Sequence, residues 1–177
     1  MEFSRQPSAQ GLYDPAFESD SCGVAFVADQ YGRASHTIVE QALTALENLD
    51  HRGAAGAEPT SGDGAGMTVA LPHDFLRAVV PFTLPAPGSY AAGIVFVSTD
   101  AEAAQRTVAL IEQIAADEGL VVLGWRDLPT DPSTLGPTAR SVMPAFRQLF
   151  VAGAGGQSGL DLERLAFCLR KSAEHRS

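Results

Sequence analysis

The amino-acid composition changes abruptly at Cys22, and we place the start of the predicted fold there. A polar, turn-rich leader over 1–21 gives way there to an apolar run that stops at the turn residues 29–32. A short run rich in Val and Phe that ends at a tight turn is typical of a buried β-strand. The sequence therefore predicts a strand over 23–29, with a cysteine at its entrance, and a returning strand over 33–36.

The rest of the chain alternates predicted helices with predicted strands. Apolar residues at helical intervals predict helices over 38–49 and 74–80, a long helix after Thr99 that Gly119 ends, and a last helix over 160–174. Short apolar runs predict strands over 64–71, 90–98, 120–125 and 141–151. This alternation predicts an α+β fold, and no composition change marks a domain boundary.

Several local signals refine this prediction. Thr37 and Thr99 each precede a glutamate by three residues, which is the spacing of a capping box. Pro144 argues for an edge position of the 141–151 strand, because proline cannot donate to a sheet ladder. Cys168 lies near the apolar side of the last helix and is expected to pack there. Trp125, Phe146 and Phe150 are expected to be core aromatics.

The charge and the cysteine count exclude several classes of partner and site. A net charge of −9 without a basic cluster argues against nucleic acid and anionic membranes, which need concentrated Lys and Arg. Cys22 and Cys168 are the two cysteines, too few for a disulfide framework or a metal-ligand set. The first residues lack a charged region followed by an apolar stretch, and no run of eighteen apolar residues occurs, so neither export nor membrane spanning is expected. We therefore expect a cytoplasmic protein.

Cys22 has a second interpretation besides that of a small buried hydrophobe. If the bond between Ser21 and Cys22 is cut, Cys22 gains a free α-amine beside its own thiol. An α-amine has a pKa of about 7.7 to 8 and a thiol about 8.5, so near neutral pH the amine can accept the thiol proton. Residues 1–21 are then a propeptide-like leader that keeps the base masked as an amide.

Four blocks, taken together, carry a family resemblance. They are Gly11 to Pro15, Asp20 to Val24, Ala45 to Ala54 and Gly62 to Gly66. In this order they resemble the start of the large subunit of bacterial glutamate synthase. The resemblance implies a class II glutamine amidotransferase with the αββα sandwich of the N-terminal-nucleophile hydrolases, and it makes 22–177 the N-terminal part of that domain.

The resemblance also implies roles for individual residues. Cys22 is the nucleophile and, through its α-amine, the base, while Arg52 holds the cysteine and its surroundings in place. Gly23, Gly53 and Asp63 are expected to support them, although a strand-initiating turn explains the Gly62 to Gly66 block almost as well. That block lacks the Gly-Lys-Ser/Thr ending of a P-loop and the third-glycine spacing of a dinucleotide-binding motif. Nucleotide binding is therefore rejected. His51 is interpreted as structural, favoured by the helix dipole.

The implied reaction is hydrolysis of the glutamine side-chain amide, which supplies ammonia for reductive transfer to 2-oxoglutarate in glutamate biosynthesis and nitrogen assimilation. This chain is expected to hold no cofactor, whereas FMN and an iron-sulfur cluster are implied for the full-length enzyme. Implied partners are glutamine, the remainder of the large subunit and a small reductase subunit.

One expected feature is missing from the sequence. The family supplies an oxyanion donor from an Asn-Gly pair, but the single asparagine here, Asn48, is followed by Leu49. We therefore expect the chain to stop inside the domain near Ser177 and to be an incomplete sandwich. Loss of one oxyanion donor costs about 100- to 1000-fold in turnover, so the isolated chain is expected to be nearly inactive.

Two alternatives stay open. The first is a non-catalytic interaction module that retains the amidotransferase core. The second is another N-terminal-nucleophile amidotransferase, one that feeds a purine or amino-sugar synthase. The leader sequence over Gly11 to Pro15 and the sequence of Leu49 to Gly53 argue against the second alternative.

Overall fold

The structure is a computed structural model that describes residues 10–11, 23–50, 53, 60, 62 and 64–176. The chain divides into two compact units, Met1–Thr68 and Val69–Ser177, and each is described by itself. Most of the predicted leader lies outside the described residues. Among the described helices, none has the length and apolar character that crossing a membrane requires.

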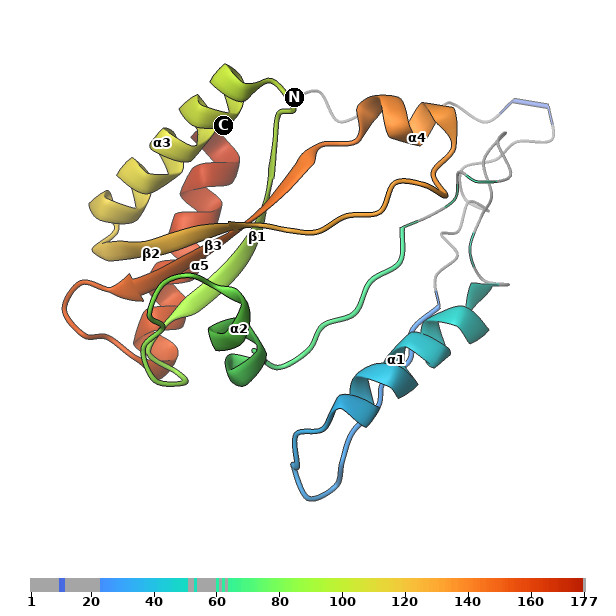
Figure 1. Cartoon of the computed structure of the whole chain (residues 1–177), viewed down its shortest axis with the longest axis horizontal. Coiled ribbons are helices and arrows are strands. Elements are labelled where there is room, and N and C mark those ends of the chain that lie inside the picture. The colour runs from blue at the N-terminus through green and yellow to red at the C-terminus, as the bar shows by residue number, and fades with distance from the viewer. Residues whose placement is uncertain are drawn as a thin grey trace. The chain divides into compact units, whose positions relative to one another are not determined.

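The second unit is built on a three-stranded antiparallel sheet (Figure 1). Its strands are β1 (Ala91–Val97), β2 (Leu120–Asp127) and β3 (Ala145–Gly153), in the order β1-β3-β2. Because β1 and β2 both pair antiparallel with β3, they run parallel to each other. The helix α3 (Ala101–Asp117) connects them, as in a split βαβ unit. The mixed helix and strand content of the prediction is confirmed.

Helices α3 and α5 (Gly159–Arg176) cover one face of this sheet (Figure 1). Their apolar sides pack on the inward residues of the strands. The core on this face contains Ile111, Ile114, Ala115, Leu120, Leu149, Val151, Leu162 and Leu169. Apolar residues that recur at helical intervals in α3 and α5 therefore pack against alternate residues of β3 in one apolar layer.

A smaller core lies on the other face, around the fully buried Phe150. The short helix α2 (His73–Val79) contributes Leu76, and the loop that follows contributes Val80, Leu84 and Tyr90. The ring of Phe82 meets that of Phe150 edge to face, with centroids 5.4 Å apart. Such a pair is worth about 0.5–1.5 kcal/mol beyond its buried area.

Helix boundaries agree with the sequence prediction, but the caps do not. Helix α1 (His36–Asn48) begins after Ser35, so Thr37 lies in its first turn and cannot be its cap. Asp100 caps α3 by accepting a hydrogen bond from the Ala103 amide at 2.8 Å. The cap predicted at Thr99 was therefore wrong. Gly119 takes a positive φ of 74° after α3 and its amide donates to Ala116 O, as predicted.

The strand predicted over 141–151 was misplaced. Residues Pro137–Val142 form the short helix α4, and β3 starts only at Ala145, directly after Pro144. Pro144 therefore has no ladder hydrogen bond to interrupt, and β3 is the central strand of the sheet. The predicted edge position was wrong.

The strands predicted over 23–29, 33–36 and 64–71 are also wrong: these residues have no regular secondary structure, apart from His36, which starts α1. A strand needs a hydrogen-bonded neighbour, and apolar alternation by itself does not provide one. The tight turn over 29–32 is confirmed, since Gly32 has φ 69° and its amide donates to Asp29 O at 3.0 Å.

Two predictions about side-chain burial need correction. Cys168 is exposed on α5, because the side of the helix that packs on the sheet carries Leu162 and Leu169 instead. Trp125 and Phe146 are half-buried, and of the three predicted core aromatics only Phe150 is fully buried.

Candidate active site

The five residues predicted to form the site are only partly described by the structure. Gly23 and Gly53 are among the described residues, whereas Cys22, Arg52 and Asp63 lie outside them. The same holds for His51. The structure therefore defines the backbone that flanks the predicted nucleophile and arginine.

The chain that leaves Cys22 is fixed seven residues later by the side chain of Asp29. Its carboxylate accepts hydrogen bonds from the amides of Tyr31 at 2.8 Å and Arg33 at 3.2 Å. The Arg33 guanidinium also pairs with it, Nη2 to Oδ2, at 2.9 Å and lies 5.0 Å over the Tyr31 ring. The Arg33 side chain, followed by the backbone amides of Arg33 and Tyr31, lowers the pKa of Asp29.

The turn was predicted from the sequence, but this carboxylate–guanidinium pair was not. The signal was present, because an aspartate that opens a turn accepts hydrogen bonds from amides two and more residues onward. The following arginine then completes a local ion pair of the i, i+4 type.

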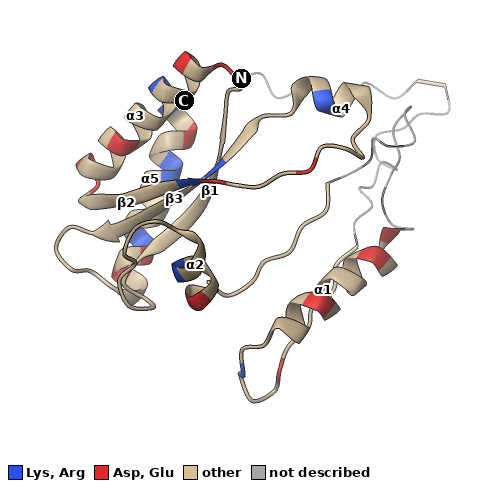
Figure 2. Cartoon of the chain, in the orientation of Figure 1, with Lys and Arg blue, Asp and Glu red and all other residues tan. Residues whose placement is uncertain are grey.

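The backbone near Arg52 is held by the end of α1. The Leu49 amide donates to Ala45 O and Leu46 O, and the Gly53 amide donates to Asp50 O at 3.0 Å. A hydrogen bond from residue i+3 to residue i is the mark of a tight turn. Helix α1 carries acidic residues but no Lys or Arg (Figure 2). In the sequence, Arg52 thus comes shortly after an acidic helix that ends at Asn48.

Gly53 does not need to be glycine for conformational reasons. It is absent from the residues with positive φ. A Cβ built on it would lie 3.4 Å from Asp50 O, which is an ordinary contact.

The residues present do not fit the iron-sulfur cluster of the implied full-length enzyme. Within the described part of the chain, no three His, Cys, Asp or Glu side chains come together in a way that could hold a metal ion. The whole sequence contains two cysteines, whereas an iron-sulfur cluster is usually held by four. No catalytic step of this chain is therefore assigned to a metal or cluster.

Comparison with known proteins gives a consistent result. The family described as glutamine amidotransferases class-II matches residues 22–177, so the matched region starts at Cys22. The chain is 42% identical to glutamate synthase [NADH] of Schizosaccharomyces pombe and 38% identical to the glutamate synthase [NADPH] large chain of Bacillus subtilis. It is 37% identical to ferredoxin-dependent glutamate synthase 1 of Arabidopsis thaliana.

These alignments cover nearly all of this chain and little of the relatives. They include 96%, 99% and 96% of the chain, but only 8%, 12% and 11% of the three relatives. The chain thus spans about a tenth of the length of the relatives it matches. Since the family match extends without a break from Cys22 to the last residue, the chain belongs to the class II glutamine amidotransferases.

Proposed function

We propose that this chain is the glutaminase part of a glutamate synthase, which hydrolyses glutamine to glutamate and ammonia. The observation that carries the proposal is the family match beginning at Cys22, combined with relatives that are glutamate synthases over nearly the whole chain. The ammonia would be used elsewhere in the larger protein for reductive transfer to 2-oxoglutarate.

In the proposed mechanism, Cys22 supplies both the nucleophile and the base once residues 1–21 are removed. The α-amine takes the thiol proton, and the thiolate attacks the carboxamide carbon of glutamine. The carbon–nitrogen bond breaks as the protonated amine gives its proton to the leaving group, which departs as ammonia. Water then attacks the thioester, with the amine as base, and releases glutamate and the free thiol.

The neighbouring residues have supporting roles in this proposal. Arg52 positions the nucleophile, and a hydrogen bond from the Gly53 amide to Asp50 O closes a turn in the described backbone beside it. Gly23 lets the backbone beside Cys22 approach the substrate closely, and Asp63 orients neighbouring groups.

The complete fold is proposed to be the αββα sandwich of the N-terminal-nucleophile hydrolases, of which the β1-β3-β2 sheet is one half. The face opposite α3 and α5 supports this. At the end away from α2, Ile94 is 60% and Phe96 65% exposed, and Phe96 meets Phe146 edge to face at 5.2 Å. A second sheet packs on a first by interdigitating side chains of the two inner faces, and these exposed apolar side chains are available for such packing.

Cofactors and electron donors belong to the rest of the larger protein. FMN and an iron-sulfur cluster are proposed to bind there, and a small reductase subunit is a further proposed partner. The names of the relatives specify NADH, NADPH and ferredoxin, so this region alone does not select the donor. A cytoplasmic location is proposed because a thiolate nucleophile survives best in a reducing compartment.

Intact mass spectrometry after exposure to 6-diazo-5-oxo-norleucine tests the proposal. We expect loss of residues 1–21 and a single adduct on the complete protein from its native cell. Cys168 is exposed, so Cys168→Ser must keep the adduct while Cys22→Ser must lose it. A complete protein that keeps its leader and stays unlabelled would instead favour the non-catalytic interaction module.

A further inference from the structure

Helix α5 has apolar residues on two opposite sides, and only one of them is buried. Leu162 and Leu169 pack in the sheet-facing core. On the outer side, Leu160 is 62% and Phe167 55% exposed. These two residues are seven positions apart, which is two helical turns, so they lie on the same side of the helix.

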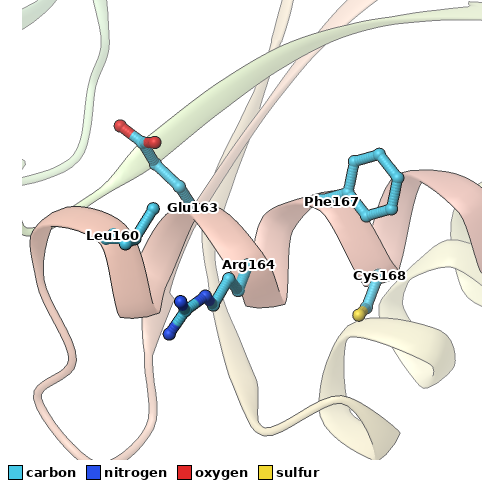
Figure 3. A pocket seen from close by; sticks show the side chains of 5 residues that line it. All are labelled: Leu160, Glu163, Arg164, Phe167 and Cys168. Carbon is cyan, nitrogen blue, oxygen red and sulfur yellow. The ribbon is translucent and has the colours of Figure 1, made fainter.

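The outer residues border a shallow hollow of about 540 Å³ along α5 (Figure 3). It is lined by Leu160, Glu163, Arg164, Phe167 and Cys168, and we refer to these five residues as the α5 outer face. All five come from one helix, so the hollow has no second wall. A small ligand, which normally has most of its surface buried, would be contacted from one side only.

Helix α3 provides a comparison, because it belongs to the same layer and packs on the same face of the sheet. Its exposed positions are occupied by charged residues, glutamine and alanine. None of its large hydrophobic residues is exposed. A helix of this layer therefore does not need an apolar outer side in order to fold, and the one on α5 calls for a partner.

The charges around the α5 outer face define the partner's chemistry. Arg164 pairs with Asp161 at 3.3 Å, and both Arg170 and Lys171 pair with Glu174. The Arg170 guanidinium also lies 5.4 Å over the Phe167 ring. Within the described part of the chain, Glu163 forms no ion pair. A complementary surface would thus offer an apolar recess for Phe167 and a basic group opposite Glu163.

We propose that the α5 outer face is the surface through which this domain docks on the remainder of the glutamate synthase polypeptide. This inference rests on the proposed function. Its occupant follows from the alignments, in which about nine-tenths of each relative lies outside the matched region. If the proposed function holds, a domain that releases ammonia for a reaction elsewhere in the same polypeptide also needs a fixed contact with the part that consumes it.

The exposed thiol of Cys168 reports directly on this contact. In the complete protein, the alkylation rate of Cys168 by N-ethylmaleimide is measured by peptide mass spectrometry. Docking is expected to make Cys168 about tenfold slower than in the variants Phe167→Glu and Glu163→Lys, which remove the apolar anchor and reverse the charge. Gln105→Glu on the outer side of α3 is the matched control and should keep the slow rate.

Phe167→Glu excludes an electrostatic explanation, whereas Glu163→Lys does not, because a new cation near Cys168 favours the thiolate. A carboxylate beside Cys168 disfavours the thiolate, so faster alkylation in Phe167→Glu can only report greater access. Fast alkylation of the unmodified protein, or a rate in Phe167→Glu that stays slow, would overturn the inference. Labelling of Cys22 by the glutamine analogue in the same samples shows separately whether the proposed function holds.

Discussion

Leu149 and Phe150 are neighbours on the central strand β3, yet their side chains belong to two separate hydrophobic cores. Leu149 packs under α3 and α5, and Phe150 packs under α2 and the loop after it. Successive side chains of a strand point to opposite faces, so a central strand with two apolar faces holds both layers together.

Replacing Phe150 by alanine is expected to destabilise the protein by about 3–5 kcal/mol, because the ring is fully buried and cannot be replaced by water. Urea unfolding of the purified chain measures the loss. Leu160→Ala, at an exposed position, should stay within about 0.5 kcal/mol. Equal losses for the two variants would contradict the two-core arrangement.

Two glycines have open space around them, but replacing each by alanine should change the stability of the protein in different directions. Gly119 has φ 74°, where an added Cβ costs about 1–2 kcal/mol, so Gly119→Ala should lower the unfolding temperature. Gly93 lies in β1 without a positive φ. Gly93→Ala should be neutral or stabilise by about 0.4–1 kcal/mol, since it restricts only the unfolded chain. Calorimetry of both variants provides the comparison.

The corrected cap of α3 predicts which of two adjacent residues matters. Asp100→Ala removes the acceptor of the Ala103 amide and should cost about 1 kcal/mol. Thr99→Ala should leave the free energy of unfolding nearly unchanged. Were Thr99→Ala the more damaging substitution, the capping box inferred from the sequence would be right after all.

Asp29 should titrate below its ordinary range. Its folded pKa is lowered by Arg33 and by two amides, so its contribution to stability is present above the unfolded value of about 3.9 and is lost as the pH falls through the folded value. Carbon-detected NMR titration measures this pKa directly. In Arg33→Ala the pKa should move back towards its usual value, because the largest cause is removed.

Loss of the nucleophile should separate the two half-reactions of the complete enzyme. Cys22→Ala is expected to abolish glutamine-dependent glutamate formation while ammonia-dependent formation continues, since only ammonia release needs the thiolate. Reductant consumption with either nitrogen source gives the measurement. Retained glutamine use would rule out Cys22 as the nucleophile.

Several features could be predicted from the sequence because their causes are local. The period of apolar residues located α1, α2, α3 and α5, and the apolar runs located β1 and β2. Gly119 ended α3 as predicted, because a left-handed residue after a helix is a short-range effect. The four motif blocks identified the family from residue order alone, and the match over residues 22–177 agrees with them.

Other features depended on partners that are distant in the chain. Strand formation over 23–29 and 64–71 needs a hydrogen-bonded neighbour, and none pairs with these described residues. The central place of β3 is decided by its pairing with both β1 and β2, which no local pattern encodes. Cys168 lies close to the apolar side of its helix in the sequence pattern, which favoured burial. Only the packing of Leu162 and Leu169 on the sheet decided that the side of α5 with Cys168 faces outward.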